Sequence, residues 1–313
     1  RRLEGRVALV TGASRGLGRS AAIALAKQGA HIIATARTEG GLTELDDEIK
    51  AIGGSATLVP VDIKDFPAID RLGAAIFERW KKLDILIGNA GVLGKLTPVS
   101  HVDQKVWDEV MAVNVTANYR LIRSMDPLLR QSDAGRAVFV TSGLAHKCWA
   151  YWGPYSISKA ALEAMVKTYA AEIATTHVRA NCFSPGATRT DMRAKAIPGE
   201  DPMSLPHPDE VAEQIIPMCE PSFSDNGGVW KYDAKGPNPY QVEHDELHAA
   251  IRNDTPKNAC LLTTGIELAD KTLRLGCRDN YNHPDAHVEC PHHVIQRNIP
   301  RILNQVEQRW NGP

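Results

Sequence analysis

The sequence predicts an α/β protein with a doubly wound parallel β-sheet and helices on both faces of that sheet. Short runs of branched apolar residues alternate with longer amphipathic stretches from residue 6 to about residue 183, as in successive βα units. The apolar runs are almost continuous, which is typical of strands covered on both faces. The first run leads directly into a glycine-rich turn and a helical pattern. Right-handed crossovers then leave essentially one arrangement, an open sheet.

Local composition predicts the elements of this sheet in chain order. The strand candidates are Val7 to Val10, His31 to Thr35, Thr57 to Val61, Leu83 to Ile87, Ala137 to Thr141 and Val178 to Phe183. The helix candidates are Leu17 to Gln28, Leu42 to Ile52, Ile69 to Lys81, Val106 to Arg130 and Tyr155 to Thr175. Gly29 and Gly53 stand where the first two helices need C-terminal caps.

The pattern changes after Thr190. Four prolines at positions 198, 202, 206 and 208 predict a lid over a binding site. A short helix is expected from Asp209 to Cys219, and a last edge strand within Ser224 to Lys235. Beyond residue 235 the βα rhythm is lost and the chain is enriched in His, Asn and Pro. We therefore divide the chain into residues 1–235, which form the sheet, and a C-terminal extension at residues 236–313 with no assigned role.

Composition excludes several classes of partner. Lys and Arg number 36 and Asp and Glu 37, so no basic excess suggests nucleic acid. Six cysteines in 313 residues are too sparse for a disulfide scaffold and favour a reducing compartment. No apolar run reaches the roughly 18 residues that span a bilayer, and the N-terminal residues do not form a signal-peptide pattern. We expect a cytoplasmic protein with no membrane and no nucleic-acid partner.

The glycine-rich turn predicts a phosphate site. It runs from Thr11 to Gly18 between the first strand and the first helix. Glycine is suited to this position because the backbone must turn tightly and approach a pyrophosphate, which the free N–H groups of the helix N-terminus stabilise. The alternative is a purely structural turn. The residues predicted to bind the dinucleotide here are Gly12, Ser14, Arg15, Gly16, Leu17 and Gly18.

The end of the second strand favours NADP(H) over NAD. It reads Thr35-Ala36-Arg37, where an NAD-binding protein of this architecture usually has an acid that accepts from the ribose hydroxyls. Arg37, together with Arg15 in the glycine turn, is suited to bind a 2′-phosphate through charge-assisted hydrogen bonds. The alternative is two solvated surface arginines.

Tyr155 and Lys159 form the predicted reaction centre. They are four residues apart at the start of a helix, so they share one face. Lowering the pKa of a phenol from about 10 to neutrality requires about 4 kcal/mol, part of which a nearby ammonium can supply. The spacing alone is also common in exposed helix pairs. Ser142 strengthens the prediction because it follows the fifth strand at the carboxyl edge, where open α/β sheets bind ligands.

These residues, with several others, resemble the short-chain dehydrogenase/reductase family, a single-domain group with the Rossmann fold. The matching segments occur in the family's order over residues 5 to 235. They are TGASRGLG at Thr11 to Gly18, Asp62, GNAG at Gly88 to Gly91, Asn114, Ser142, YSISK at Tyr155 to Lys159 and SPGATRT at Ser184 to Thr190. Gly88 departs from the Asn that often opens the third of these motifs, and the chain beyond Gly236 has no counterpart in the family.

The resemblance implies a catalytic tetrad of Asn114, Ser142, Tyr155 and Lys159. Tyr155 would exchange the proton, Ser142 would bind the substrate oxygen, Lys159 would hold the nicotinamide ribose and lower the tyrosine pKa, and Asn114 would order a relay water. The resemblance further implies cofactor contacts from Asp62, Ile63, Asn89, Ala90, Gly91, Tyr155, Lys159, Pro185, Gly186, Thr188 and Thr190.

Other conspicuous side chains have weaker interpretations. Trp149, Tyr151 and Trp152 lie between two tetrad residues, and they form either an apolar substrate wall or ordinary packing. Cys148 has no partner at a recognisable spacing, so a structural role is expected. The remaining candidates are the residues His244, His248, His283, His287, Cys290, His292 and His293. Their spacing matches no common zinc pattern, and we expect surface histidines and no metal site.

The sequence therefore predicts an NADP(H)-dependent oxidoreductase that interconverts a carbonyl and an alcohol, with a 3-oxoacyl thioester as the most concrete substrate candidate. The alternative is an NADP(H)-binding redox sensor or scaffold whose His-rich tail recruits a partner. An intact tetrad favours the enzyme. By the same resemblance we expect a homodimer or homotetramer in which the long helices at Val106 to Arg130 and Tyr155 to Thr175 pair across a two-fold axis.

Overall fold

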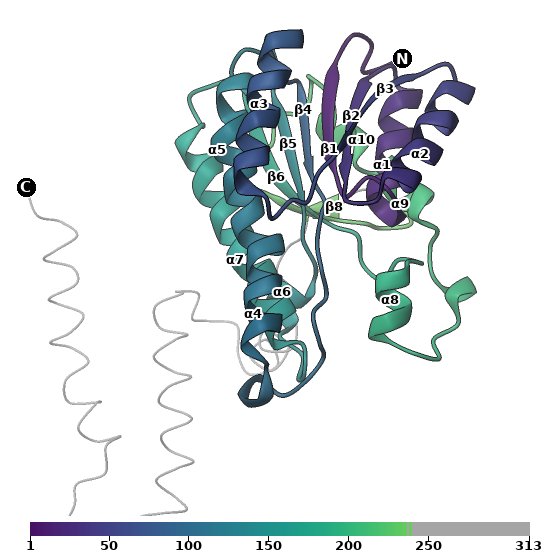
Figure 1. Cartoon of the computed structure of the whole chain (residues 1–313), viewed down its shortest axis with the longest axis vertical. Helices are drawn as coiled ribbons and strands as arrows, with labels where there is room; N and C mark the ends of the chain where they lie inside the picture. Colours follow the sequence, from purple (N-terminus) through teal and green to yellow (C-terminus); the bar gives the residue numbers. More distant parts are fainter. Residues whose placement is uncertain (237, 240–313) are drawn as a thin grey trace, which may run out of the picture. The chain divides into compact units, whose positions relative to one another are not determined.

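The computed structural model describes residues 1–236 and 238–239 and contains an eight-stranded sheet in these residues (Figure 1). The strand order is β3-β2-β1-β4-β5-β6-β7-β8. Strands β1 to β7 pair in parallel, and β8 is antiparallel to β7. The strands are β1 (Val7–Thr11), β2 (His31–Ala36), β3 (Ser55–Pro60), β4 (Ile85–Gly88), β5 (Arg136–Val140), β6 (Arg179–Ser184), β7 (Val229–Lys231) and β8 (Asn238–Pro239).

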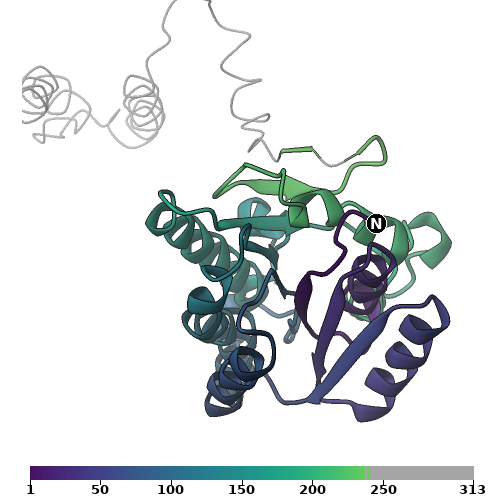
Figure 2. The same ribbon diagram turned by 90° about the horizontal axis from the view of Figure 1, so that it is seen from above.

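Helices cover both faces of the sheet, so the predicted doubly wound architecture is confirmed (Figure 2). One face carries α1 (Gly16–Lys27), α2 (Glu39–Ala51), α9 (Pro208–Glu213) and α10 (Ile216–Cys219). The other carries α3 (Phe66–Trp80), α5 (Ala117–Leu129) and α7 (Gly153–Glu172). Alternate side chains of β1 enter the two cores, Ala8 and Val10 on the first side and Val7 and Leu9 on the second, because successive strand side chains point to opposite faces.

Local sequence explains where these helices begin and end. Gly29 and Gly53 follow α1 and α2 with φ of 96° and 73°, a left-handed conformation that favours glycine, so the predicted C-terminal caps are confirmed. Asp65 caps α3 by accepting a 3.0 Å hydrogen bond from the Ala68 N–H. Both devices satisfy main-chain groups that a helix end leaves without an internal partner.

The predicted single helix from Val106 to Arg130 is wrong in one respect, because it is interrupted. The structure has α4 (Gln104–Met111), a π-helical turn (Ala112–Thr116) and α5 (Ala117–Leu129). The wider turn places Asn114 in the interior, where its side chain hydrogen-bonds to both main-chain groups of Val92. Single π-helical turns are frequent at functional sites, and periodicity alone does not reveal them.

The chain after β6 also differs from expectation. The predicted helix from Asp209 to Cys219 is two short helices, α9 and α10, with Pro217 in the first turn of the second. The predicted edge strand is present as β7, but β8 lies outside it in the sheet. The remaining helices are α6 (Leu144–Lys147), α8 (Asp191–Ala196) and the 3-10 turns Val99–His101 and Pro202–Ser204. The division at residue 235 stays a prediction, because residues 240–313 lie outside the described part of the chain.

Candidate active site

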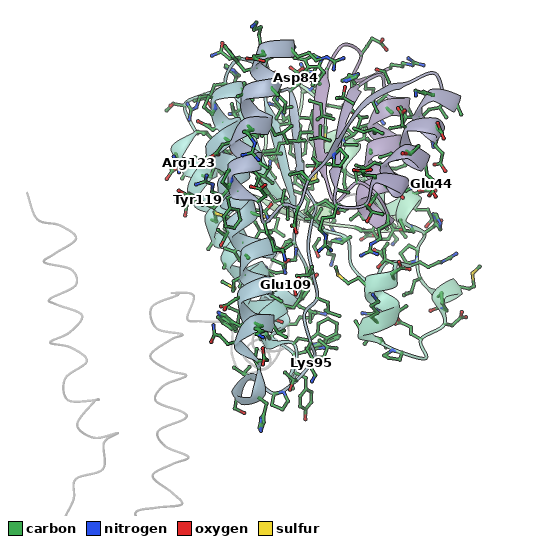
Figure 3. The ribbon with its side chains drawn as sticks, in the orientation of Figure 1. Glu44, Asp84, Lys95, Glu109, Tyr119 and Arg123 are labelled. Carbon is green, nitrogen blue, oxygen red and sulfur yellow. The ribbon has the colours of Figure 1, made fainter. Side chains whose placement is uncertain are left out.

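A large cavity of about 1120 Å³ lies at the carboxyl edge of the sheet. In Figure 3, Asp84, which precedes β4, is labelled at one end of the sheet, and Lys95, which follows β4, is labelled beyond the other end. Lys95 lines the cavity. The loops that follow β1, β2, β4, β5 and β6 all contribute to its wall, as expected where parallel strands end together. Every predicted site residue lies in the described part of the chain, and all of them except Asn114 line this cavity.

The glycine turn packs tightly against the loop after β4. Gly12 has φ of 66°, and a Cβ there would lie only 3.0 Å from the Ala90 Cα. A Cβ at Gly18 would collide with the Asn89 side-chain amide and the Gly12 carbonyl. The Asn89 Nδ2 in turn donates to the Thr11 carbonyl at 2.9 Å. These contacts require glycine and hold the turn open toward the cavity.

The first turn of α1 has the composition of an anion site. Within the described residues, the side chain of its N-cap residue, Arg15, does not form a capping hydrogen bond, and the first turn of α1 contains no acidic residue. Residues 16–18, whose N–H groups belong to those that a helix N-terminus leaves without an internal partner, line the cavity together with Arg15 and Arg37. Asp62 lies on the same wall, and its Oδ1 accepts from the Lys64 N–H at 2.9 Å. This lining fits a phosphorylated dinucleotide.

The close packing around Gly88 explains why glycine replaces the Asn that often opens the family motif. A Cβ at this position would lie 2.7 Å from the Asn118 Oδ1 and still closer to the Phe139 ring. Both side chains are fully buried, so neither can move aside without disturbing the core. The larger side chain that often opens the motif therefore has no room in this protein, while Asn89 and Ala90 keep their positions at the cavity.

Ser142, Tyr155 and Lys159 meet at the other end of the cavity. Lys159 is buried and donates a 2.8 Å hydrogen bond from Nζ to the main-chain oxygen of Val140, at the end of β5. The same Nζ lies 5.6 Å from the centroid of the Tyr155 ring. Ser142 accepts from the Leu144 N–H at 3.3 Å. The start of α7 and the end of β5 thus bring together side chains that are distant in sequence.

Burial shifts the pKa values of both Tyr155 and Lys159. Removal from water raises the pKa of Tyr155 to about 12, while a hydrogen bond with Ser142 acts to lower it. This net direction is opposite to the lowering expected from a nearby ammonium. Burial lowers the pKa of Lys159 to about 8, against the opposing charges of Cys182 and Glu163. The phenol is therefore neutral and the amine mostly cationic at neutral pH.

Asn114 lies behind the cavity wall. Its Oδ1 accepts from the Val92 N–H at 2.8 Å, and its Nδ2 donates to the Val92 carbonyl and to the Ser158 Oγ, each at 2.9 Å. Its main-chain oxygen accepts from the Asn118 Nδ2 at 2.8 Å. The Asn114 side chain therefore braces the loop after β4 and the start of α7, and its water-ordering role stays a prediction.

The aromatic segment separates into one wall residue and two surface residues. Trp152 is buried, lines the cavity and packs edge-to-face on Tyr155 with ring centroids 6.1 Å apart. Trp149 and Tyr151 are exposed and lie outside the cavity lining. Cys148 is an exposed free cysteine with φ of 47°. Sequence position alone did not distinguish these residues, because their burial depends on the turn between α6 and α7.

Several lining residues were not predicted from the sequence. They come from the loop after β4 and from α8 in the proline-rich segment: Leu93, Gly94, Lys95, Leu96, Met192, Lys195 and Ala196. Pro198 and Pro208 of the proline-rich segment line the cavity, and the predicted role of this segment as a lid stays a prediction. The loop after β4 continues directly from the Asn89-Ala90-Gly91 motif, and that continuity was the available signal.

Neither a metal site nor a membrane span is found among the described residues. No three His, Cys, Asp or Glu side chains gather there closely enough to hold a metal ion. No helix in residues 1–236 combines the length and apolar character that a bilayer crossing requires. The histidine positions between 244 and 293 lie outside the described part of the chain.

Comparison with known proteins agrees with this geometry. The family model described as short chain dehydrogenase matches residues 6–201. The uncharacterized oxidoreductase YciK of Escherichia coli K12 is 39% identical over 212 residues, which are 67% of this chain and 84% of that protein. A short chain dehydrogenase of Shigella flexneri 2a, solved with NADP, has a TM-score of 0.71 at 35% identity and covers 74% of this chain and 98% of its own. An Escherichia coli CFT073 counterpart, solved with NADPH, has a TM-score of 0.68 at 36% identity over 74% and 97%. The glycine turn, the Tyr–Lys pair and the order of the strands therefore have a common explanation. This chain belongs to the short chain dehydrogenase family of oxidoreductases.

Proposed function

We propose that this protein is an NADP(H)-dependent oxidoreductase that transfers a hydride between the nicotinamide and a carbonyl or secondary alcohol. The observation that carries the proposal is the convergence of Ser142, Tyr155 and Lys159 on the cavity that the glycine turn also lines. One cavity thus offers a phosphate-binding end and a proton-transfer end.

The cofactor, when bound, supplies the hydride, and the chain's own residues manage the proton. Tyr155 donates its phenolic proton to the substrate oxygen during reduction, and Ser142 hydrogen-bonds the same oxygen. The Lys159 ammonium holds the nicotinamide ribose and stabilises the phenolate that remains. Asn114 supports the proton relay by bracing the loop at Val92.

The protonation state of Tyr155 in the free protein suits the role of an acid in reduction. With a pKa of about 12, Tyr155 holds its proton in the free protein and acts as an acid. A base for alcohol oxidation requires the phenolate, which is scarce under these conditions. Reduction is therefore the direction in which Tyr155 begins in the required protonation state.

Two observations support NADP(H) as the cofactor. Arg15 and Arg37 line the end of the cavity at β2, and the segment Thr35-Ala36-Arg37 at the end of that strand contains no carboxylate. The two solved relatives described above contain NADP and NADPH. Guanidinium groups bind a phosphate with paired hydrogen bonds, whereas a carboxylate would repel it.

The substrate end of the cavity favours an apolar carbonyl compound. Its apolar lining includes Leu93, Leu96, Leu144, Trp152 and Met192. Lys95 and Lys195 are exposed at the same cavity and suit an anionic group on the distal part of a substrate. A 3-oxoacyl thioester combines these features and remains the most concrete candidate.

The test is NADPH oxidation at 340 nm with a panel of ketones, aldehydes and 3-oxoacyl thioesters. Tyr155→Phe removes only the phenolic oxygen, so turnover should fall by about 10² to 10⁴, the usual contribution of general acid–base catalysis. Tyr119→Phe on the exposed side of α5 is the matched control and should keep wild-type turnover. Equal turnover by Tyr155→Phe and wild type refutes the role of Tyr155.

The panel also addresses the alternative function. Tight NADPH binding with no turnover of any panel member would favour the redox sensor or scaffold. The residues that this alternative assigns to partner recruitment lie at 236–313, almost wholly outside the described part of the chain. A cytoplasmic location and assembly as a homodimer or homotetramer also stay predictions.

A further inference from the structure

Glu163 is a buried carboxylate that the proposed mechanism does not use. Its residue is only 3% exposed, and it does not line the cavity. It follows Lys159 by four residues, as Lys159 follows Tyr155, so the three side chains share one face of α7. A buried charge is unfavourable unless partners compensate for it, so the contacts of Glu163 require an explanation.

Both carboxylate oxygens of Glu163 have partners. Oε1 accepts a 2.7 Å hydrogen bond from the Thr141 Oγ1, a fully buried side chain. Oε2 lies 2.8 Å from the Nε2 of His146 on α6. Thr141 and His146 stand on either side of Ser142 in the sequence. One carboxylate therefore contacts both ends of the short segment that carries Ser142.

This arrangement adds to the link that Lys159 itself makes. Lys159 is bonded to the main-chain oxygen of Val140, so α7 contacts the end of β5 and the start of α6 at three successive points. Ser142 is hydrogen-bonded to Tyr155 within this clamped segment. A shift of a few tenths of an ångström between α6 and α7 would alter that bond directly, because hydrogen-bond geometry is narrow.

Glu163 also acts through its charge. The titratable groups that face it are Lys159 on its own helix, His146 on α6 and Cys182 on β6. Its negative charge raises the pKa of Lys159 against the effect of burial, and it also raises the pKa of the Cys182 thiol. Of these groups, Lys159 is the one placed at the reaction centre.

We propose that Glu163 is a positioning residue for the reaction: its carboxylate fixes the Ser142 segment against Tyr155 through Thr141 and His146, and its negative charge, one helical turn along α7, stabilises the Lys159 ammonium. This inference rests on the proposed function. It separates two contributions of one side chain, a geometric one that passes through His146 and an electrostatic one that reaches Lys159.

The test compares Glu163→Gln and His146→Gln with Glu172→Gln, which changes an exposed glutamate on the same helix. Glutamine at 163 keeps the size of the side chain and an acceptor for Thr141 but removes the charge. In Glu163→Gln we expect kcat for reduction to fall about tenfold, equivalent to one pKa unit of lost stabilisation, with little change in the KM for the carbonyl substrate. The pH above which the activity of this variant declines should also move below 8.

His146→Gln removes the second contact and leaves the charge in place. We expect a lower kcat and no displacement of the basic limb. Glu172→Gln should match wild type in both respects. A pH profile is decisive because a purely structural loss lowers kcat at every pH and does not move the limb. If Glu163→Gln and Glu172→Gln have the same kcat and the same profile, the proposal is overturned.

A readout independent of turnover separates this inference from the proposed function. Titration of the lysine side chains by ¹⁵N NMR, with Lys159→Met to assign the signal, reports the pKa of Lys159 in wild type and in Glu163→Gln. A lower pKa in the variant supports the electrostatic contribution even if no panel substrate is reduced. An unchanged value contradicts it even if the enzyme is active. Should Glu163→Gln fail to fold, an unaltered kcat in His146→Gln overturns the geometric contribution.

Discussion

The ammonium of Lys159 donates its hydrogen bond to the main-chain oxygen of Val140, so a charge is held against the carboxyl end of β5 with 4% of the residue exposed. Burial lowers the pKa of this amine from 10.5 to about 8. Below pH 8 the folded protein therefore carries a buried cation at a free-energy cost, and this cost is relieved as the pH rises from 8 toward 10.5.

Lys159→Met should be more stable than wild type near pH 7, because it removes this buried charge. It should also be inactive, because it lacks the ammonium that the proposed mechanism requires. The lowered pKa of Lys159 corresponds to a destabilisation of the folded protein of about 3 kcal/mol, in which the attraction of Glu163 is already included. Loss of the hydrogen bond to Val140 offsets about 1 to 2 kcal/mol of this gain. We expect a net gain of about 1 to 2 kcal/mol at pH 7 that disappears by about pH 10. Urea unfolding at several pH values measures it, and a variant that is less stable at pH 7 would contradict the prediction.

Arg37→Ala should change cofactor preference without changing catalysis. Loss of a charge-assisted bond to a phosphate is worth about 1.5 to 3 kcal/mol, so the KM for NADPH should rise roughly 10- to 100-fold. The KM for NADH should stay the same, because that cofactor has no 2′-phosphate. Arg71→Ala is the control, since this exposed arginine on α3 lies outside the cavity. Parallel losses with both cofactors would exclude a phosphate role for Arg37.

Gly88→Ala should destabilise the protein, although alanine is ordinarily favourable relative to glycine. The new Cβ would lie 2.7 Å from the Asn118 Oδ1 and closer to Phe139, and such overpacking typically costs about 1 to 3 kcal/mol. Gly40→Ala is the matched control, because a Cβ there meets nothing within 4 Å. The two variants should differ in their midpoints of chemical unfolding, with Gly88→Ala lower. Equal midpoints would mean that the core around Phe139 has more room than the contacts indicate.

Trp152→Ala should change substrate binding as well as stability. The buried indole lines the cavity and packs on Tyr155, so its removal leaves a void worth about 3 to 5 kcal/mol and opens the apolar wall. We expect the KM to rise most for the bulkier apolar substrates of the panel. Trp149→Ala removes an exposed neighbour outside the cavity and serves as control. Unchanged KM values for every substrate would remove Trp152 from the substrate wall.

Much of the site could be predicted because its residues are fixed by local chemistry. The glycine turn at Gly12 to Gly18 could be predicted because its glycine spacing lies directly between a strand pattern and a helix pattern. Tyr155 and Lys159 share a helix face through their spacing alone. The order of strands and helices could be predicted because apolar runs alternate with amphipathic segments along the sequence.

Other features depend on contacts between segments that are distant in sequence. The π-helical turn at Asn114 is accompanied by hydrogen bonds to Val92 and Ser158, and the periodicity of α4 and α5 does not show it. Trp152 and Trp149 are close neighbours of the same type, yet one is buried and one exposed.

The sequence by itself determined the sheet, the phosphate-binding turn and the identity of the reactive side chains, because each depends on residue type and short-range spacing. The tertiary structure alone decided their protonation and their support. The pKa of Tyr155 rises because of burial, and Thr141 and His146, which lie on either side of Ser142, contact the Glu163 carboxylate on α7. Desolvation and long-range hydrogen bonds are properties of the packed chain, so no local pattern contains them.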